Sequence, residues 1–278
     1  MRFTPVALAA AALLGVATSG VQAGLSTCAQ QIAFKLTNVF EFGDQQFRYD
    51  DCEKLPDGRG ITSGIAGFCT GTGDAILVLK EYDRVTSNNN PLHKYTPIVQ
   101  KLSDSESGST KGLDGYCNAW KSLGKSNAQF QQVQRTIRDK LYTSKAADYA
   151  SKLGLRLAIS QAQLYDAVIQ HGEGDDPDSL GWLIKQTNKA FTSDKAGSSG
   201  STLSINGKKV DEIEWLNKFL DVRYKDLYNP HNKESRDVWR ESVTRVKSYQ
   251  FVVKQKQYTW DKQITALDND GKQINVQC

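Results

Sequence analysis

The sequence predicts a mainly α-helical protein with a few short strands, and three observations support this class. Apolar residues over 28–42 recur at helical spacing, and the stretch over 146–171 is apolar around most of a helical circumference. Strand character is confined to short segments, near residues 47–52 and in a terminal hairpin over 262–276. With 278 residues, 39% of them hydrophobic, the chain can bury a core without help from a metal or a disulfide.

The first half contains clear boundary signals. The helix over 28–42 has one apolar face, and Gly43 is expected to end it. Residues 55–60 (Leu-Pro-Asp-Gly-Arg-Gly) predict a tight turn, because proline fixes φ and glycine permits positive φ. A short apolar element follows over 62–68, and Asp74 is an expected N-cap of the next helix.

The second half contains the most apolar segment of the chain. A helix over 146–171 that is apolar nearly all round is typical of a central, buried helix. Residues 192–208 have the composition of a flexible surface insertion. A further helix is expected over 238–253, before the terminal hairpin.

Residues 1–23 have the pattern of a secretory signal peptide. Arg2 precedes an apolar run over 6–16, and small residues lead to Ala23. A membrane anchor is the alternative, but the run is shorter than the roughly 20 residues of a spanning helix, and polar residues follow it. We therefore expect a secreted mature chain, residues 24–278, with a net charge that falls from +4 to +3 when Arg2 is lost.

The mature part contains an odd number of cysteines, so at least one is unpaired within the chain. Cys69 lies in an apolar stretch and is expected to be a free, buried thiol. The other four are expected to form two disulfides, whose connectivity the sequence leaves open: Cys28, Cys52, Cys117 and Cys278.

Several function classes are disfavoured. The small net charge does not indicate a nucleic-acid-binding face, and three scattered histidines disfavour a metal site built on paired histidines. The glycine-rich residues 67–73 lack the lysine of a phosphate loop. Residues 268–271 resemble the start of a calcium loop but lack its final glutamate, so a hairpin turn explains them better. We expect no metal and no other cofactor.

Two carboxylic acids remain as candidates for catalysis. Glu41 lies between two phenylalanines, and desolvation there would favour its neutral form. Asp57 lies in the tight turn beside Arg59, whose charge would keep it ionised. One protonated and one ionised carboxyl group are what a glycosidase uses as acid and base. A solvated helix end and an ordinary turn aspartate account for the same residues on spacing alone.

A longer motif favours the glycosidase interpretation. Residues 55–74 (LPDGRGITSGIAGFCTGTGD) closely resemble the signature of the glycoside hydrolase family 46 chitosanases, Asp-Gly-Arg-Gly-Tyr-Thr-x-Gly-Ile-x-Gly-Phe-Cys-x-Gly-Thr-Gly-Asp. Further matches follow in order at 171–179 and 219–223, with a weaker one around His231, Ser235 and Arg236.

The resemblance implies a lysozyme-like, two-lobed fold in which residues 24–278 form one catalytic domain with a cleft between the lobes. It implies an endo-acting enzyme, expected to be a monomer, that hydrolyses β-1,4 links of chitosan with inversion. Glu41 would be the general acid, Asp57 the general base, and Thr62 would help to position the attacking water.

Further site residues are carried over from the same resemblance or expected from their place near the motif. The expected substrate contacts are Tyr49, Glu53, Arg59 and Asp74. The expected charged network that supports the cleft consists of Asp176, Arg223 and Arg236.

Chitosan is a polycation, so a cleft that binds it needs local negative charge. An acidic cluster provides this charge, unless it is simply a solvated face: Asp50, Asp51, Glu53, Asp57 and Asp74. Two alternatives stay open, a lysozyme-like hydrolase of N-acetylated polymer and a catalytically inactive carbohydrate-binding protein. The acidic cluster favours an amine-bearing sugar, and the presence of Glu41, Asp57 and Thr62 favours an enzyme.

Overall fold

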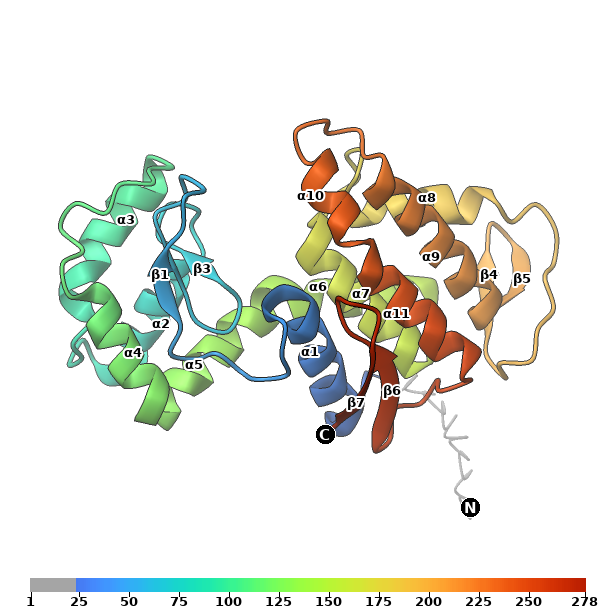
Figure 1. Cartoon of the computed structure of the whole chain (residues 1–278), viewed down its shortest axis with the longest axis horizontal. Helices are drawn as coiled ribbons and strands as arrows, with labels where there is room; N and C mark the ends of the chain where they lie inside the picture. Colours follow the sequence, from blue (N-terminus) through green and yellow to red (C-terminus); the bar gives the residue numbers. More distant parts are fainter. Residues whose placement is uncertain (1–23) are drawn as a thin grey trace, which may run out of the picture.

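The computed structural model describes residues 24–278, so the expected signal peptide lies outside the described residues. The chain folds into a smaller and a larger lobe, on the left and the right of Figure 1. Each lobe has its own cluster of buried hydrophobic side chains. No helix within residues 24–278 is long and apolar enough to cross a membrane.

The larger lobe is built around one central helix, α7. Twelve of the 14 residues of α7 are buried, and it contacts α1, α6, α8, α9 and α11. Two hairpins, β4–β5 and β6–β7, complete the lobe. Its elements are α1 (Thr27–Phe42), α6 (Ser144–Leu153), α7 (Ala158–His171), α8 (Leu180–Lys189), β4 (Thr202–Ile205), β5 (Lys208–Asp211), α9 (Glu212–Tyr228), α10 (Arg236–Glu241), α11 (Val243–Lys254), β6 (Gln263–Leu267) and β7 (Gln273–Gln277).

The smaller lobe packs helices around a short three-stranded antiparallel sheet of order β1-β2-β3. The indole of Trp120 is fully buried in its core and makes an edge contact with the ring of Phe130, with centroids 4.9 Å apart. The elements are β1 (Cys52–Lys54), β2 (Ile61–Ser63), β3 (Phe68–Cys69), α2 (Ala75–Thr86), the 3₁₀ turn η1 (His93–Tyr95), α3 (Thr96–Asp104), α4 (Tyr116–Ser126) and α5 (Ala128–Arg138).

The chain crosses between the lobes twice. Residues 43–51 lead from α1 to β1, and α5 continues through a π-helical segment, η2 (Asp139–Thr143), into α6. Such π-helical turns are uncommon and often occur at functional sites. Here the segment lies where the helix passes from one hydrophobic core to the other.

Most of the boundary predictions are confirmed. Helix α1 ends at Gly43, which takes a left-handed conformation with φ of 81°. The side chain of Asp74 accepts a hydrogen bond from the N–H of Ala75 and caps α2. The terminal hairpin is present as β6 and β7, with its turn at residues 268–272.

Four segment predictions need correction. The helix predicted over 146–171 is two helices, because Gly154 takes a left-handed conformation and ends α6 before α7 begins. Of the strand predicted over 47–52, only Cys52 belongs to β1. The helix predicted over 238–253 is interrupted at Ser242, and the predicted insertion over 192–208 contains strand β4.

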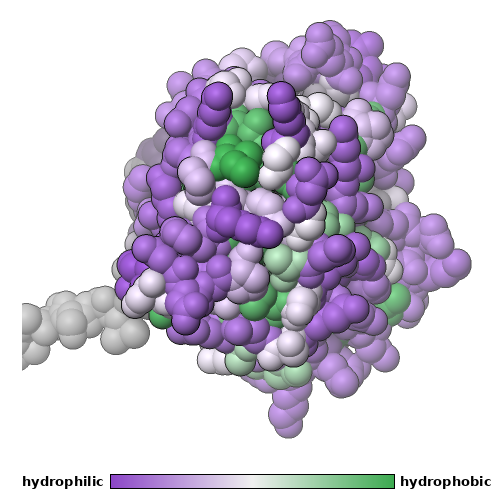
Figure 2. Space-filling view, turned by 90° about the vertical axis from the view of Figure 1, so that its left-hand side faces the viewer, coloured by the Kyte–Doolittle hydropathy of each residue, from purple (hydrophilic) through white to green (hydrophobic). Residues whose placement is uncertain are grey.

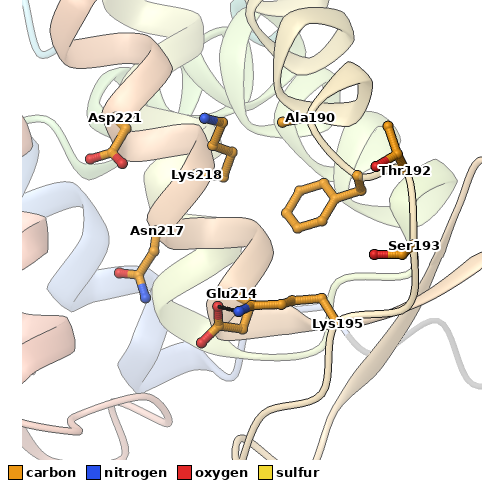
Figure 3. Close-up of a pocket in the computed structure, with 9 residues that line it drawn as sticks. Ala190, Thr192, Ser193, Lys195, Glu214, Asn217, Lys218 and Asp221 are labelled. Carbon is orange, nitrogen blue, oxygen red and sulfur yellow. Dashed lines mark ion pairs between the residues drawn. The ribbon is translucent and has the colours of Figure 1, made fainter.

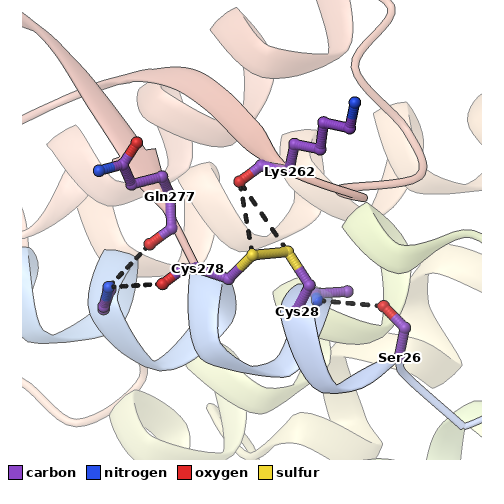
Figure 4. Close-up of a disulfide and its surroundings, with 7 residues drawn as sticks. Ser26, Cys28, Lys262, Gln277 and Cys278 are labelled. Atoms are coloured by element: carbon purple, nitrogen blue, oxygen red, sulfur yellow. Dashed lines mark hydrogen bonds between the residues drawn. A yellow bond between two sulfur atoms is a disulfide. The ribbon is translucent and has the colours of Figure 1, made fainter.

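The two disulfides join elements that are distant in sequence. Cys28 pairs with Cys278 and ties β7 to α1, across a sequence separation of 250 residues (Figure 4). Lys35 of α1 adds hydrogen bonds from its Nζ atom to the carbonyl oxygens of Gln277 (2.8 Å) and Cys278. The second bridge, Cys52–Cys117, joins β1 to α4. The expected number of bridges and the free, buried Cys69 are confirmed.

The outer face of the smaller lobe is largely hydrophilic, with only small hydrophobic areas (Figure 2). Among residues 24–278, the large hydrophobic side chains that are strongly exposed are Tyr228 and Val238, both in the larger lobe.

Candidate active site

The end of α1 faces strand β2 across the space between the lobes. Glu41 and Phe42 of the larger lobe line a cavity of about 230 Å³ together with Thr62, Ser63 and Gly64 of the smaller lobe. The rest of its lining is Arg48, Asp51, Glu53 and Leu55. A smaller adjoining cavity is also lined by Glu41 and Phe42, with residues 65–67 opposite. Glu41 therefore lies in a cleft between the lobes.

Glu41 is placed in the cleft by the last turn of α1, whose other face is buried in the larger lobe. Its side chain is 37% exposed, and its Oε1 atom accepts a hydrogen bond from Nη2 of Arg245 at 2.6 Å. Phe42 lines the same cavity, as expected of an apolar neighbour, but nothing in the local sequence indicates a charged partner for this carboxylate. The ring of Phe40 packs against Tyr249, while a buried guanidinium contacts the carboxylate.

A buried charge network runs from Glu41 into the larger lobe. Nη2 of Arg245 lies 3.1 Å from Oδ1 of Asp166, and Oδ2 of Asp166 lies 2.7 Å from Nη1 of Arg223. Nε of Arg223 donates to Nε2 of His171 at 3.1 Å. The network thus joins α11, α7 and α9, and it ends at the imidazole of His171.

Burial and charge act together on these groups. Burial alone would lower the pKa of Arg245, but the carboxylates of Asp166 and Glu41 outweigh this effect and raise it. Burial, followed by the charge of Arg223, lowers the pKa of His171 well below its usual value. A carbonyl oxygen only accepts, so Nδ1 of His171 donates to the carbonyl of Asp178 at 2.9 Å, which leaves Nε2 as the acceptor for Arg223.

Two residues of the sequence-predicted network lie outside this cluster. Arg223 belongs to it, whereas Asp176 is exposed, and neither Asp176 nor Arg236 forms an ion pair within residues 24–278. The acid and the arginine that join Arg223 in this cluster are Asp166 and Arg245. The signal that could have found Asp166 is a lone acidic residue in the middle of a helix that is apolar nearly all round.

Asp57 lies in the turn between β1 and β2, with 29% of its side chain exposed. The backbone N–H of Arg59 donates to its Oδ1 atom at 3.0 Å, and Nε of Arg59 donates to Oδ2 at 2.9 Å. The backbone hydrogen bond, followed by the guanidinium, lowers the pKa of Asp57 despite some desolvation. Asp57 is outside the lining of the cavity that contains Glu41, and it lies five residues before Thr62.

The turn that contains Asp57 packs closely against the backbone of the loop after α3. A Cβ atom at Gly108 would collide with the carbonyl of Gly58, so only glycine allows the loop after α3 to lie against this turn. Thr62 is positioned by the neighbouring strand β3. It pairs with Cys69 in the β2–β3 ladder, and its hydroxyl lies 3.3 Å from the Cys69 sulfur.

The other predicted contact residues have identifiable structural partners. The hydroxyl of Tyr49 accepts a hydrogen bond from Arg135 at 2.8 Å, and the Tyr49 carbonyl accepts from Trp120. Oδ1 of Asp74 accepts from the backbone N–H of Cys69 (2.8 Å) as well as capping α2. Glu53 is exposed and lines the cavity.

A second pocket lies in the larger lobe, between α9 and the segment that follows α8 (Figure 3). Its lining includes Phe191 and two lysines, Lys195 and Lys218, and Nζ of Lys195 pairs with Glu214 at 3.6 Å. None of the residues that the sequence singled out for catalysis or substrate binding lines this pocket. The cleft that contains Glu41 is therefore the better candidate for an active site.

Known proteins resemble this chain over most of its length. Residues 35–262 match the family model described as glycosyl hydrolase family 46. A chitosanase of Bacillus subtilis (strain 168) is 44% identical over 248 residues, which cover 89% of this chain and 85% of that protein. A chitosanase of a Streptomyces species is 35% identical over 70% of this chain and 65% of its own length.

Solved structures agree with this family. The native chitosanase of Bacillus subtilis MY002 superposes with a TM-score of 0.77 at 41% identity, covering 91% of this chain and 100% of that one. A mutant of the same enzyme, solved in complex with 6 GlcN, superposes equally well. A family 46 chitosanase of Gynuella sunshinyii, solved with chitotetraose, has a TM-score of 0.76 at 34% identity over 92% of this chain and 100% of that one.

The sequence motif, the mainly helical fold and the similarity over most of the chain lead to one conclusion. This chain is a glycoside hydrolase that belongs to glycosyl hydrolase family 46.

Proposed function

We propose that the protein is a secreted, monomeric endo-chitosanase that hydrolyses β-1,4 links of chitosan with inversion. The observation that carries this proposal is the arrangement of the cleft. Glu41 approaches it from the larger lobe, and Thr62, with the Asp57 turn before it, approaches from the smaller lobe. An inverting glycosidase needs an acid on one side of the bond and a base with a water on the other.

Glu41 is the proposed general acid. Arg245 contacts its Oε1 atom, so Oε2 is the oxygen available to protonate the leaving glycosidic oxygen. The hydrogen bond from Arg245 also fixes the orientation of the carboxyl group, which supplies positioning for proton donation.

Asp57 is the proposed general base. The hydrogen bonds from Arg59 keep it ionised, so it can take a proton from water on the opposite face of the sugar. The Thr62 hydroxyl is proposed to orient this water, which contributes positioning and no new chemistry.

The proposed substrate follows from charge and from the relatives. Glu53 lines the cavity and provides negative charge for the amines of glucosamine, together with Asp51, which is paired with Arg48 at 3.2 Å. Relatives were solved with 6 GlcN and with chitotetraose. The expected signal peptide and the two disulfides support secretion, because disulfides persist in oxidising compartments. The remaining proposed contacts are Tyr49, Arg59 and Asp74.

The substrate proposal is tested by comparing turnover on highly deacetylated and fully acetylated polymer, measured as release of reducing ends. We expect turnover on the deacetylated polymer to be greater by at least about tenfold, because acidic groups in the cleft attract only the charged sugar. Preference for the acetylated polymer would instead support the lysozyme-like alternative. No release from either polymer would support a carbohydrate-binding protein without activity.

Glu41→Gln removes the proposed acid while it keeps the shape of the side chain. We expect kcat to fall by roughly a hundredfold or more, since a general acid contributes about 10²–10⁴ to the rate. The matched control is Glu81→Gln, because Glu81 also ends in an arginine ion pair of 2.6 Å but lies on α2 away from the cleft. Near-normal turnover of folded Glu41→Gln protein would exclude Glu41 as the acid.

Arg59→Ala tests the base through the pH profile of kcat/KM. The base must be ionised, so activity is lost as pH falls through its pKa. Removing the guanidinium eliminates one of the interactions that lower the pKa of Asp57, although the backbone hydrogen bond remains. We therefore expect the acid limb to move to higher pH, and Arg59→Lys to move it less. An acid limb that stays in place would assign this titration to another group.

A further inference from the structure

Three side chains that can ligate a metal meet in the larger lobe, away from the residues proposed for catalysis. Asp178 lies in the loop between α7 and α8, Asp226 in the last turns of α9, and His231 in the loop before α10. One ligand atom from each lies within 4.8 Å of the other two. We propose that these residues form a binding site for a divalent transition-metal ion of the zinc type.

The burial of the two carboxylates gives an independent reason to expect a ligand. Asp178 is 6% exposed and Asp226 is 5% exposed. Oδ2 of Asp226 is buried and accepts no hydrogen bond within the described part of the chain. Nδ1 of His171 lies 3.6 Å from this oxygen and already donates to the carbonyl of Asp178. A buried carboxylate oxygen without a partner is costly, and a cation would satisfy it.

The one guanidinium that acts on this pair of acids compensates it only in part. Arg223 is the nearby guanidinium, and it is already paired with Asp166 at 2.7 Å. Asp178 and Asp226 share a side-chain hydrogen bond, so one of the two carboxyl groups holds a proton when no ion is bound. A divalent cation between them would displace this proton to solvent and bind both carboxylates.

The site is partly organised before any ion binds. The backbone N–H groups of His231 and Asn232 donate to the two oxygens of Asp178, at 2.8 and 2.7 Å. The ring of His231 is held against Trp182 in an edge contact, with centroids 4.9 Å apart. These contacts orient a carboxylate and an imidazole, as hydrogen bonds from the surrounding protein do for the ligands of metal sites.

The donor set determines which ion fits. Two carboxylate oxygens and one imidazole nitrogen suit Zn²⁺ or Mn²⁺ better than Ca²⁺, which prefers six or more oxygens. His231 is 56% exposed, so an ion can enter from solvent and keep water in its remaining positions. Binding would replace the present hydrogen bond between Nδ1 of His231 and Asp178. A bound ion would also link His231 in the α9–α10 loop to Asp226 at the end of α9.

The test is zinc binding to the full mature chain after treatment with EDTA. Equilibrium dialysis with Zn²⁺ should give one ion per chain, and the melting temperature should rise by about 5 °C or more at a hundredfold excess over Kd. Asp226→Asn and His231→Gln should each lower the affinity at least tenfold. His231 is exposed, so its variant is expected to fold even if Asp226→Asn does not.

The matched control is the pair formed by the exposed His93 and the buried Asp83 in the smaller lobe, whose Nδ1 and Oδ2 atoms lie 3.0 Å apart. His93→Gln removes a histidine–aspartate pair that has no second carboxylate, and it should leave zinc binding unchanged. Absence of stoichiometric binding would overturn the proposal. Binding that survives in both site variants, or that is lost equally in His93→Gln, would also overturn it. Binding of Ca²⁺ in preference to Zn²⁺ would overturn the assignment to a transition metal.

Discussion

The ion pair between Arg245 and Glu41 connects the cleft to the interior of the larger lobe. Arg245 is held in place by Asp166, which also holds Arg223, so the position of the Glu41 carboxylate depends on three buried charges. Removing one partner from a buried charge network typically costs roughly 3–5 kcal/mol, because the remaining charges are left uncompensated. The same contacts that orient the proposed acid are therefore expected to stabilise the packing of α7, α9 and α11.

The two-lobed architecture explains why the proposed acid and base have such different surroundings. Glu41 ends a helix of the larger lobe and meets a buried guanidinium, whereas Asp57 lies in a turn of the smaller lobe and is held by its neighbour Arg59. The lobes are joined by the segment after α1 and by the helical passage through η2. Any motion of one lobe against the other would change the distance between the two carboxyl groups.

The sequence was most informative where structure is local. The turn over 55–60, the cap at Asp74 and the end of α1 at Gly43 follow from the conformational preferences of single residues. The motif that carries Asp57 and Thr62 is also continuous in sequence. Its resemblance to family 46 therefore indicates the family from the sequence alone.

The sequence was least informative where distant elements meet. Asp166 and Arg245 are 79 residues apart, and only the packing of α11 against α7 brings them together. The motif positions of Asp176 and Arg236 carry no information on burial. The contact of Glu41 with Arg245 cannot be predicted from local sequence either, because Arg245 lies 204 residues further along the chain. The break at Gly154 is hidden because apolar periodicity continues across it.

The central claim is that water, activated by Asp57, attacks the sugar on the face opposite Glu41. This claim is tested most directly by NMR of the first products released from a β-linked glucosamine oligomer. Attack from the opposite face inverts the anomeric centre, so the account predicts α-anomers before mutarotation. Initial release of β-anomers would contradict it, since retention requires a carboxylate close enough to form a covalent intermediate.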